Sequence, residues 1–343
     1  MPTRLPPGPR GGAAGPRTAS AVHAVRGAVR RLLASAAAAP FRGAPLVVAC
    51  SGGPDSLALA AAAAHVARRE GVAVRGLVVD HGLQAGSDEV ADRTAAQLAE
   101  LGCPARVIPV RVAGGGGPEA AARRARYAAL ARERPEGSLV LLGHTLDDQA
   151  ETVLLGLGRG SGPRSVAGMR PVDPPWARPF LDVRRATTVA ACDALGLVPW
   201  RDPHNADARF TRVRLRTEVL PLLEEVLQGG VAPALARTAR QLREDADALD
   251  ELAAGVRSQV EVDGGLDARA LAAHPAALRR RVLRSWLLDA GVAELSDEHL
   301  RAADRLIGEW RGQGGHALPG DFVVRRAHGT LLVEAAVRKP PNG

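Results

Sequence analysis

Cysteine and lysine are scarce in this chain of 343 residues, and each scarcity excludes a class of site. The three cysteines, Cys50, Cys103 and Cys192, lie far apart and form no C-x-x-C pair, which argues against a disulfide framework, a zinc site and an iron–sulfur cluster. The one lysine is Lys339, so no Walker-type phosphate loop is present. No apolar stretch is long and charge-free enough to span a membrane, and the first residues lack the order of a signal peptide. We therefore expect a cytoplasmic protein with no membrane partner.

Acidic residues are absent from the first part of the chain. Residues 1–43 hold seven arginines and no Asp or Glu, while the formal net charge of the whole chain is +8. Subtracting these seven charges leaves +1 for the other 300 residues, so a basic surface there must come from local clustering. Residues 1–20 are rich in Pro, Gly and Arg, and we expect them to be disordered. Residues 21–39 show a helical pattern whose arginines form either a solvated face, the favoured interpretation, or a contact for a polyanion.

Short apolar runs alternate with helix-forming segments along the first part of the chain. The runs predict strands over 46–50, 72–79, 105–112 and 138–142. The segments between them predict helices over about 55–69, 87–101 and 118–134. Ser87 is followed by two acids and is expected to cap the second of these helices. The alternation is typical of an α/β fold with a doubly wound, mostly parallel sheet, in which ligands bind at the carboxyl ends of the strands.

The first predicted strand leads directly into Ser51-Gly52-Gly53-Pro54-Asp55-Ser56, which precedes an alanine-rich helix former. A strand, a tight glycine turn and a helix start aim free N–H groups and the positive end of the helix dipole at one point, and this favours a phosphate group. The glycines permit close approach of the backbone, and the serines add hydroxyl donors. Asp55 is a carboxylate beside those phosphates, where a magnesium ion is expected. We interpret the loop as a nucleotide site; a plain Gly-Gly turn is the alternative.

A second polar motif follows the fourth predicted strand. It reads Gly143-His144-Thr145-Leu146-Asp147-Asp148-Gln149-Ala150-Glu151-Thr152. Its polar residues recur at helical spacing, so most of them can line one side of a helix start. Three carboxylates this close together are costly unless a metal ion or another cation neutralises them. A solvated helix N-terminus explains some of the acids but not the Gly-His pair at the strand end, so the motif favours a functional site.

Further elements continue the pattern in order along the chain. They are D-H-G-L at 80–83, E-x-x-A-R-x-x-R-Y at 119–127, R-G-S-G at 159–162 and G-M at 168–169. With S-G-G-x-D-S and G-H-x-x-D-D-Q-x-E-T, they resemble the tRNA(Ile)-lysidine synthetases, which are N-type ATP pyrophosphatases of the PP-loop superfamily. The resemblance covers about residues 46–220. Within 201–216 a further stretch is similar to that family's R-x-D-x-S-N…R-N-R-x-R, with His204 where a serine is usual and Val213 where an asparagine is usual.

The resemblance implies an ATP-dependent carbon–nitrogen ligase that modifies one base of a tRNA. Such an enzyme adenylates oxygen 2 of the wobble cytidine in the isoleucine tRNA with a CAU anticodon and releases pyrophosphate. Free L-lysine then attacks carbon 2 through its ε-amine and expels AMP, which leaves lysidine. The implied fold is that of the adenine nucleotide α-hydrolases, with ATP as a substrate and Mg²⁺ as the metal.

The resemblance also implies roles for individual residues. Residues 51–56 and His144 would bind ATP, and Asp55 would hold the metal ion. The catalytic residues would be Asp55, Asp148, Arg123 and Arg212. A carboxylate is wanted near the lysine ε-amine to take its proton, and Asp148 is favoured for this. The remaining lysine-binding or tRNA-binding residues would be Asp147, Glu151, Arg126 and Arg214. Arginines suit phosphates and the substrate carboxylate through bidentate pairing, although each could equally belong to a structural ion pair.

Beyond residue 229 the strand pattern gives way to amphipathic helices. These are expected over 231–258, 268–289 and 297–311, followed by a β-hairpin over 322–334. The middle helix carries Arg279, Arg280, Arg281, Arg284 and Trp286, which we interpret as an RNA-binding surface rather than only a solvated face. The predicted division of the chain is a tail over 1–20, a catalytic PP-loop domain over 21–228, a helical tRNA-contacting domain over 229–318, and a hairpin with its tail over 319–343.

Two alternatives from the same residues stay open. Another PP-loop enzyme that modifies tRNA, such as a thiolase, commonly needs paired cysteines, which this chain lacks. A non-catalytic RNA-binding protein that senses ATP would bind the nucleotide without turnover, although the carboxylate set is intact. The sequence does not determine the oligomeric state, and a homodimer stays open.

Overall fold

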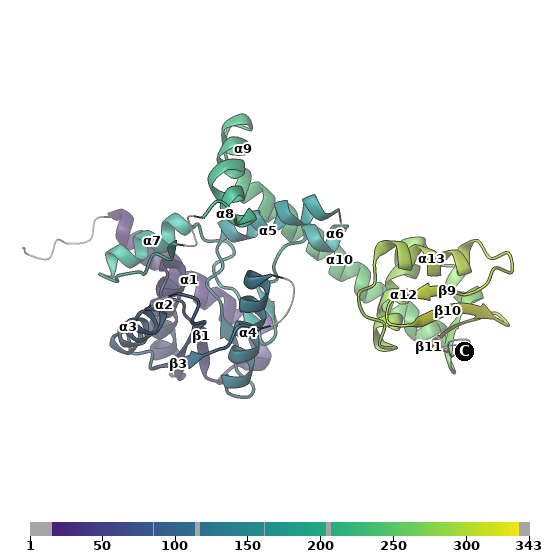
Figure 1. Ribbon diagram of the computed structural model, residues 1–343, viewed down its shortest axis with the longest axis horizontal. Helices are drawn as coiled ribbons and strands as arrows, with labels where there is room; N and C mark the ends of the chain where they lie inside the picture. Colours follow the sequence, from purple (N-terminus) through teal and green to yellow (C-terminus); the bar gives the residue numbers. More distant parts are fainter. Residues whose placement is uncertain (1–15, 85, 114–116, 161, 204–206, 336–343) are drawn as a thin grey trace, which may run out of the picture. The chain divides into compact units, whose positions relative to one another are not determined.

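The structure is a computed structural model that describes residues 16–84, 86–113, 117–160, 162–203 and 207–335 (Figure 1). The chain forms two compact units. The first contains the chain up to Leu154 and Gly168–Arg237, and the second contains Leu155–Ala167 and the chain from Thr238 onward. Most of the tail predicted over 1–20 lies outside the described residues. Helix α1 begins at Pro16, which is earlier than the predicted start at residue 21.

A six-stranded sheet forms the centre of the first unit, in the order β3-β2-β1-β4-β6-β5. Its strands are β1 Leu46–Ala49, β2 Val74–Asp80, β3 Ala105–Pro109, β4 Val140–Leu141, β5 Val172–Asp173 and β6 Trp176–Ala177. Neighbours pair in parallel except β5 with β6, so the predicted mostly parallel sheet is confirmed. No strand is predicted at β5 or β6, because two-residue strands show too little alternation in a sequence. Strand β1 lies between β2 and β4, so the loop that follows it sits where the strand order reverses.

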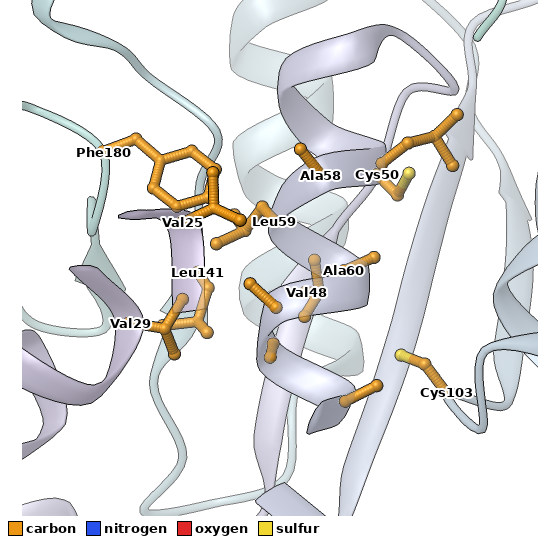
Figure 2. Close-up of a cluster of buried hydrophobic side chains, with 14 of the residues drawn as sticks. Val25, Val29, Val48, Cys50, Ala58, Leu59, Ala60, Cys103, Leu141 and Phe180 are labelled. Atoms are coloured by element: carbon orange, nitrogen blue, oxygen red, sulfur yellow. The ribbon is translucent and has the colours of Figure 1, made fainter. Parts of the chain in front are cut away.

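Helices cover both faces of this sheet (Figure 1). The first unit contains α1 Pro16–Ala34, α2 Pro54–Glu70, α3 Ser87–Glu100, α4 Pro118–Glu133 and α7 Arg185–Ala194, with a short 3-10 helix at Ala36–Phe41 after α1. Val48 of β1 faces the core that contains α1, α2, α3 and α7, whereas Val47 faces a second core with Leu130 of α4. On the first face, Val25 of α1 and Leu59 of α2 lie beside Phe180 (Figure 2).

The sequences of α2 and α3 explain how α2 packs and where α3 begins. The run Leu57–Ala64 of α2 is buried throughout, since small side chains let the helix pack closely on β1 and on its helical neighbours. Ser87 does not cap α3 as predicted: the N-cap is Gly86, in the left-handed region at φ 77°, and no side chain bonds to it. In α1, Arg30 and Arg31 are exposed, which both the solvated face and the polyanion contact require.

A small apolar cluster places a third group of helices beside the end of β4. This group consists of α5 Leu146–Arg159, α8 Thr211–Arg214, a π-helical turn at Leu215–Val219 and α9 Leu220–Val226. Leu146 and Ala150 of α5 pack in one cluster with Leu220 and Val231. The arginine-rich segment 211–216 is therefore held near the acidic start of α5.

The second unit contains a five-stranded antiparallel sheet in the order β7-β8-β11-β10-β9. Its strands are β7 Glu261–Val262, β8 Gly265–Asp267, β9 His316–Leu318, β10 Phe322–Ala327 and β11 Thr330–Ala335. The predicted hairpin is confirmed as β10 and β11, and the expectation of helices alone before it is wrong. Strands β7, β8 and β9 are only two or three residues long, so they show no alternation that a sequence reader can recognise.

The helices of this unit are α6 Pro163–Val166, α11 Ala268–Ala272, α12 Ala276–Asp289, α13 Asp297–Gly308, the end of α5 from Leu155 and the later part of α10 Val231–Val260. The single helix predicted over 268–289 is two helices, because Pro275 lacks an N–H and serves as the N-cap of α12. Trp286 is buried in the core of this unit, so it does not belong to an exposed RNA-binding surface. Among the described residues, no single helix is long and apolar enough to cross a membrane; one pair of segments, Thr211–Val226 with Val231–Val260, meets that test jointly but is bent by 95°.

Candidate active site

The loop after β1 is a tight turn that leads into the first residues of α2. Gly52 lies in the left-handed region at φ 81°, and a Cβ atom there would lie 2.5 Å from the Thr94 hydroxyl oxygen, so the loop requires glycine. The Ser56 hydroxyl donates to the Gly53 carbonyl at 3.0 Å and accepts from the Ser51 N–H at 3.2 Å. Pro54 occupies the first turn of α2, where its missing N–H costs nothing. Hydrogen bonds between its own residues thus stabilise the loop, and the N-terminus of α2 lines an adjacent cavity.

The Gly-His pair after β4 brings the second motif against this loop. A Cβ atom on Gly143 would lie 3.1 Å from the Ser56 nitrogen, which is a tight contact, so glycine favours the close approach of the end of β4 to α2. His144 lines the same cavity, and burial lowers its pKa to about 3, which keeps the imidazole neutral. Its Nδ1 atom is buried and has no hydrogen-bond partner among the described residues. A neutral ring with an unused nitrogen is suited to contact a polar group of a ligand.

Arg185, at the start of α7, joins the two motifs. Its guanidinium donates to Asp55 Oδ2 at 3.0 Å and to Asp148 Oδ1 at 2.7 Å, and its Nη1 lies 3.9 Å from Glu151 Oε1. The Thr188 hydroxyl, one turn further along α7, donates to the other oxygen of Asp55. One guanidinium group therefore interacts with three carboxylates, which follow the ends of two different strands. Nothing in the sequence analysis identified Arg185, because only the folded chain places it opposite these acids.

Glu151 is held by the arginines of the segment 211–216. Its side chain is fully buried and accepts from Arg216 at 2.8 and 3.3 Å, while Arg212 Nη1 lies 3.7 Å from it. Arg212 also donates to the Thr152 hydroxyl at 3.4 Å. The structure therefore brings α5 and the segment 211–216 into direct contact. Arg216 is the stronger partner, although the sequence analysis named Arg212 and Arg214.

The protein separates the pKa values of the three carboxyl groups. Burial raises the pKa of Asp55 and of Glu151, and the neighbouring arginines offset only part of this. Burial acts on Asp148 in the same direction, but Arg185 and two hydrogen bonds from Thr145 outweigh it and hold the pKa of Asp148 below its ordinary value. Asp148 is therefore the most firmly ionised member of the cluster. Asp55 and Glu151 are the better proton acceptors.

Other predicted residues lie farther from this centre. Asp147 points toward α7, where it accepts from the Arg185 backbone N–H at 2.8 Å and pairs with Arg184 at 3.0 Å. Arg123 is exposed on α4 and donates to the Tyr127 hydroxyl at 3.1 Å. Arg214 pairs with Glu218 at 2.9 Å on the surface of its own helix. The structure therefore brings together Asp55, Asp148, Glu151 and Arg212, but it does not bring Asp147, Arg123 and Arg214 to the same centre.

These elements enclose a cavity of about 680 Å³ in the first unit, a size suited to a nucleotide. Its walls include the loop 51–56, the D-H-G-L segment after β2, Arg126 and Tyr127 of α4, and Arg185. His204 lies outside the described residues. Val213, the other departure noted in the sequence, is buried in α8 rather than in the cavity wall.

A parallel sheet with a glycine loop after its first strand, and a nucleotide-sized cavity at the strand ends, defines a PP-loop ATP-utilising enzyme. The family model described as the PP-loop domain matches residues 27–223, and the model described as the TilS substrate binding domain matches residues 266–332. The chain is 57% identical over 324 residues to the tRNA(Ile)-lysidine synthase of Nocardia farcinica, which covers 93% of this chain and 98% of the relative. It is 59% identical over 296 residues to that of Mycobacterium tuberculosis H37Rv, covering 83% and 90%. The chain therefore belongs to the tRNA(Ile)-lysidine synthase family.

A solved structure shows the same fold at low sequence identity. The U34-tRNA thiolase NcsA from Methanococcus maripaludis, with its [4Fe-4S] cluster, superposes with a TM-score of 0.56 and 16% identity, over 66% of this chain and 80% of that one. At this identity the similarity concerns the fold alone. All three cysteines of the present chain are buried and free.

Proposed function

We propose that this chain makes lysidine at the wobble cytidine of the isoleucine tRNA with a CAU anticodon. In the first step, oxygen 2 of the cytidine attacks the α-phosphorus of ATP and pyrophosphate leaves. In the second, the ε-amine of free L-lysine attacks carbon 2 of the base, the carbon–oxygen bond to the adenylate breaks, AMP leaves and the amine loses its proton. The observation that carries the proposal is the convergence of Asp55, Asp148 and Glu151 on Arg185 beside the phosphate-type loop.

The loop 51–56 supports the first step. Its serine hydroxyls and the N-terminus of α2 line the cavity and can hold the phosphates that become pyrophosphate. His144, neutral and with a buried nitrogen unused, is placed to contact the nucleotide. Arg126 lines the same cavity and can face phosphate oxygens there.

The acidic pair Asp55 and Asp148 fits a magnesium ion. One oxygen of each carboxylate already faces the same cation, the Arg185 guanidinium, and carboxylate oxygens are ligands that Mg²⁺ prefers. The described residues contain no group of three or more His, Cys, Asp or Glu that could hold a metal ion, so an ion at Asp55 and Asp148 would need phosphate and water oxygens as its other ligands. Bound there with ATP, Mg²⁺ would neutralise charge on the departing pyrophosphate.

The three carboxyl groups support the second step in different ways. Asp148 lines the cavity and stays ionised, so it can hold the lysine ε-ammonium beside the base. A depressed pKa makes Asp148 a weak proton acceptor; the pKa values of Asp55 and Glu151 are raised, and of these two only Asp55 lines the cavity. Arg212 and Arg216 keep Glu151 in place and lie close to where a substrate carboxylate or phosphate would bind.

The test is pyrophosphate release from ATP, measured with labelled lysine and the CAU-anticodon isoleucine tRNA added singly and together. We expect lysine to enter only that tRNA and only with ATP, and expect Asp55→Ala to abolish incorporation. The surface variant Arg106→Ala, which removes an exposed pair with Glu133, is the matched control and should keep most activity. Pyrophosphate release driven by another acceptor would point to a different PP-loop tRNA-modifying enzyme. ATP binding without turnover on any tRNA would instead favour an ATP-sensing RNA-binding protein.

A further inference from the structure

The second unit has a basic cavity that the reaction above does not use. It measures about 460 Å³ and is lined by residues of α10 and α12 together with Arg164 of α6 and Glu261 of β7. Four arginines and three carboxylates contribute to its walls. Every lining residue belongs to the second unit, so the cavity can be considered without reference to the first.

The arginines of this cavity are unequally neutralised. Asp250 accepts from Arg164 at 2.5 Å and from Arg281 at 3.0 Å, so one carboxylate is shared by two guanidinium groups. At the other end, Arg257 has two carboxylates to itself, Glu261 at 3.1 Å and Asp289. The positive charge is therefore in excess on the side of Asp250.

Arg284 lies on that side, one helical turn after Arg281. Its side chain is partly buried and makes no hydrogen bond or ion pair with any residue that the structure describes. Burial and the nearby Arg164 lower its pKa, and the attraction of Asp250 offsets only part of this. A guanidinium has five N–H donors in a planar fork, and leaving them unpaired beside other cations is unfavourable unless an anion binds.

We propose that Arg164, Arg281 and Arg284 form a binding site for a backbone phosphate of the tRNA substrate, with Arg284 as the direct ligand. The inference rests on the proposed function, since it takes an RNA as the substrate. A single free phosphate would gain little against the carboxylate of Asp250, whereas a polyanion that binds at many points adds the release of its counterions at each. Arg281 and Arg284 also lie within residues 266–332, which match the substrate binding domain model.

The first experiment compares Arg284→Gln with the full-length wild-type protein for binding of the isoleucine tRNA between 50 and 200 mM salt. Each phosphate contact contributes about 0.9 to the slope of log K against log salt. The factor by which the tRNA affinity falls between 50 and 200 mM salt should therefore be about threefold smaller in the variant than in the wild type. The KM for tRNA should rise, whereas the KM for ATP and the kcat at saturating tRNA should not change. Arg284→Lys should recover part of the affinity. Arg301→Gln is the matched control, because it removes an equal charge from an exposed pair with Asp297 in the same unit.

Asp250→Asn provides a test of opposite sign. Removing the shared carboxylate makes the cavity more positive, so tRNA should bind more tightly and with a steeper salt slope. A purely structural role for the cluster predicts weaker binding in both variants with an unchanged slope, and this result would overturn the proposal.

Two further outcomes separate this inference from the proposed function. If Arg284→Gln forms lysidine and its KM for tRNA and its salt slope equal those of the wild type, the phosphate site is overturned and the proposed reaction stays intact. Conversely, a reduced tRNA salt slope in a protein that forms no lysidine supports the site while the proposed reaction fails. Inorganic phosphate, titrated at millimolar concentrations, should leave the wild-type tRNA affinity at constant ionic strength unchanged; competition specific to phosphate would assign the site to the free anion instead.

Discussion

Replacing Arg185 by alanine should weaken the first unit more than any surface charge change, and do so in a pH-dependent way. Arg185 is 23% exposed and neutralises Asp55 and Asp148 directly, with Glu151 close by. Removing one partner of a buried ion pair costs about 3–5 kcal/mol, and we expect the lower value, about 3 kcal/mol, because water reaches part of this site. For a unit of this size, a change of 1 kcal/mol shifts the melting temperature by about 2–4 °C, so the expected decrease is about 6–12 °C at neutral pH.

The pH dependence follows from the pKa of Asp148. In the wild-type protein this pKa lies below its ordinary value of 3.8, so Asp148 stabilises the fold above that pH, and the contribution is lost as the pH falls through the folded-state value. Without Arg185, burial dominates and raises the folded pKa of Asp148, as it already raises that of Asp55. A carboxyl group with a raised pKa costs stability at neutral pH, and the cost disappears as the pH falls below the ordinary value. The difference between variant and wild type should therefore be largest near pH 7 and shrink toward pH 4.

Calorimetry of both proteins from pH 4 to pH 7.5 measures this, and the transition of the first unit is the one that ATP shifts upward. Arg214→Ala is the control, because its exposed pair with Glu218 should contribute little. Arg185→Lys should recover part of the loss, since it keeps the charge but cannot bond to both carboxylates. If Arg185→Ala and the control had the same melting temperature at pH 7, Arg185 would not be the counterion of this cluster.

Three further substitutions probe separate parts of the fold. Gly52→Ala should destabilise by about 1–2 kcal/mol and abolish ATP binding, measured by calorimetric titration, because alanine disfavours φ 81° and its Cβ would meet Thr94. Phe180→Ala should cost about 3–5 kcal/mol in denaturant unfolding, because this fully buried ring fills the core on the α2 face of the sheet. Arg279→Ala should lower the stability of the second unit by about 2–3 kcal/mol and leave ATP binding unchanged, because Asp304 loses a bidentate partner at 2.7 and 3.0 Å.

Matched variants distinguish these effects from general ones. Gly43 has the same φ of 81° and open space around it, so Gly43→Ala should destabilise through the backbone without affecting ATP binding. ATP binding by Gly52→Ala at the level of Gly43→Ala would contradict the steric argument. Arg301→Gln should leave the second unit as stable as the wild type. An equal loss of stability in Arg279→Ala and Arg301→Gln would show that the Arg279–Asp304 pair contributes no more than an exposed pair.

The arginines of α12 that were predicted to bind RNA have different partners in the structure, and the sequence did not reveal this. Arg279, Arg280 and Arg281 are consecutive in the chain, but α12 turns about 100° per residue, so they point in different directions. Arg279 reaches Asp304 on α13, Arg281 reaches Asp250 on α10, and Arg280 lies 3.8 Å from Asp304. Arg284, which was part of the same predicted surface, makes no hydrogen bond or ion pair with a carboxylate among the described residues, although Asp250 is near enough to raise its pKa.

The sequence by itself determined four strands of the parallel sheet, the glycine loop and the acidic motif after β4, because each of these depends on neighbours within a few residues. Apolar runs fix strands, Gly52 fixes the turn, and the acids of α5 follow β4 directly. Only the tertiary structure decided which cation neutralises those acids, since Arg185 is 130 residues from Asp55 in the chain. An ion pair leaves no periodic trace in either partner's sequence. It exists because the order β2-β1-β4 brings two strand ends together, and α7 packs against α2 on the same face.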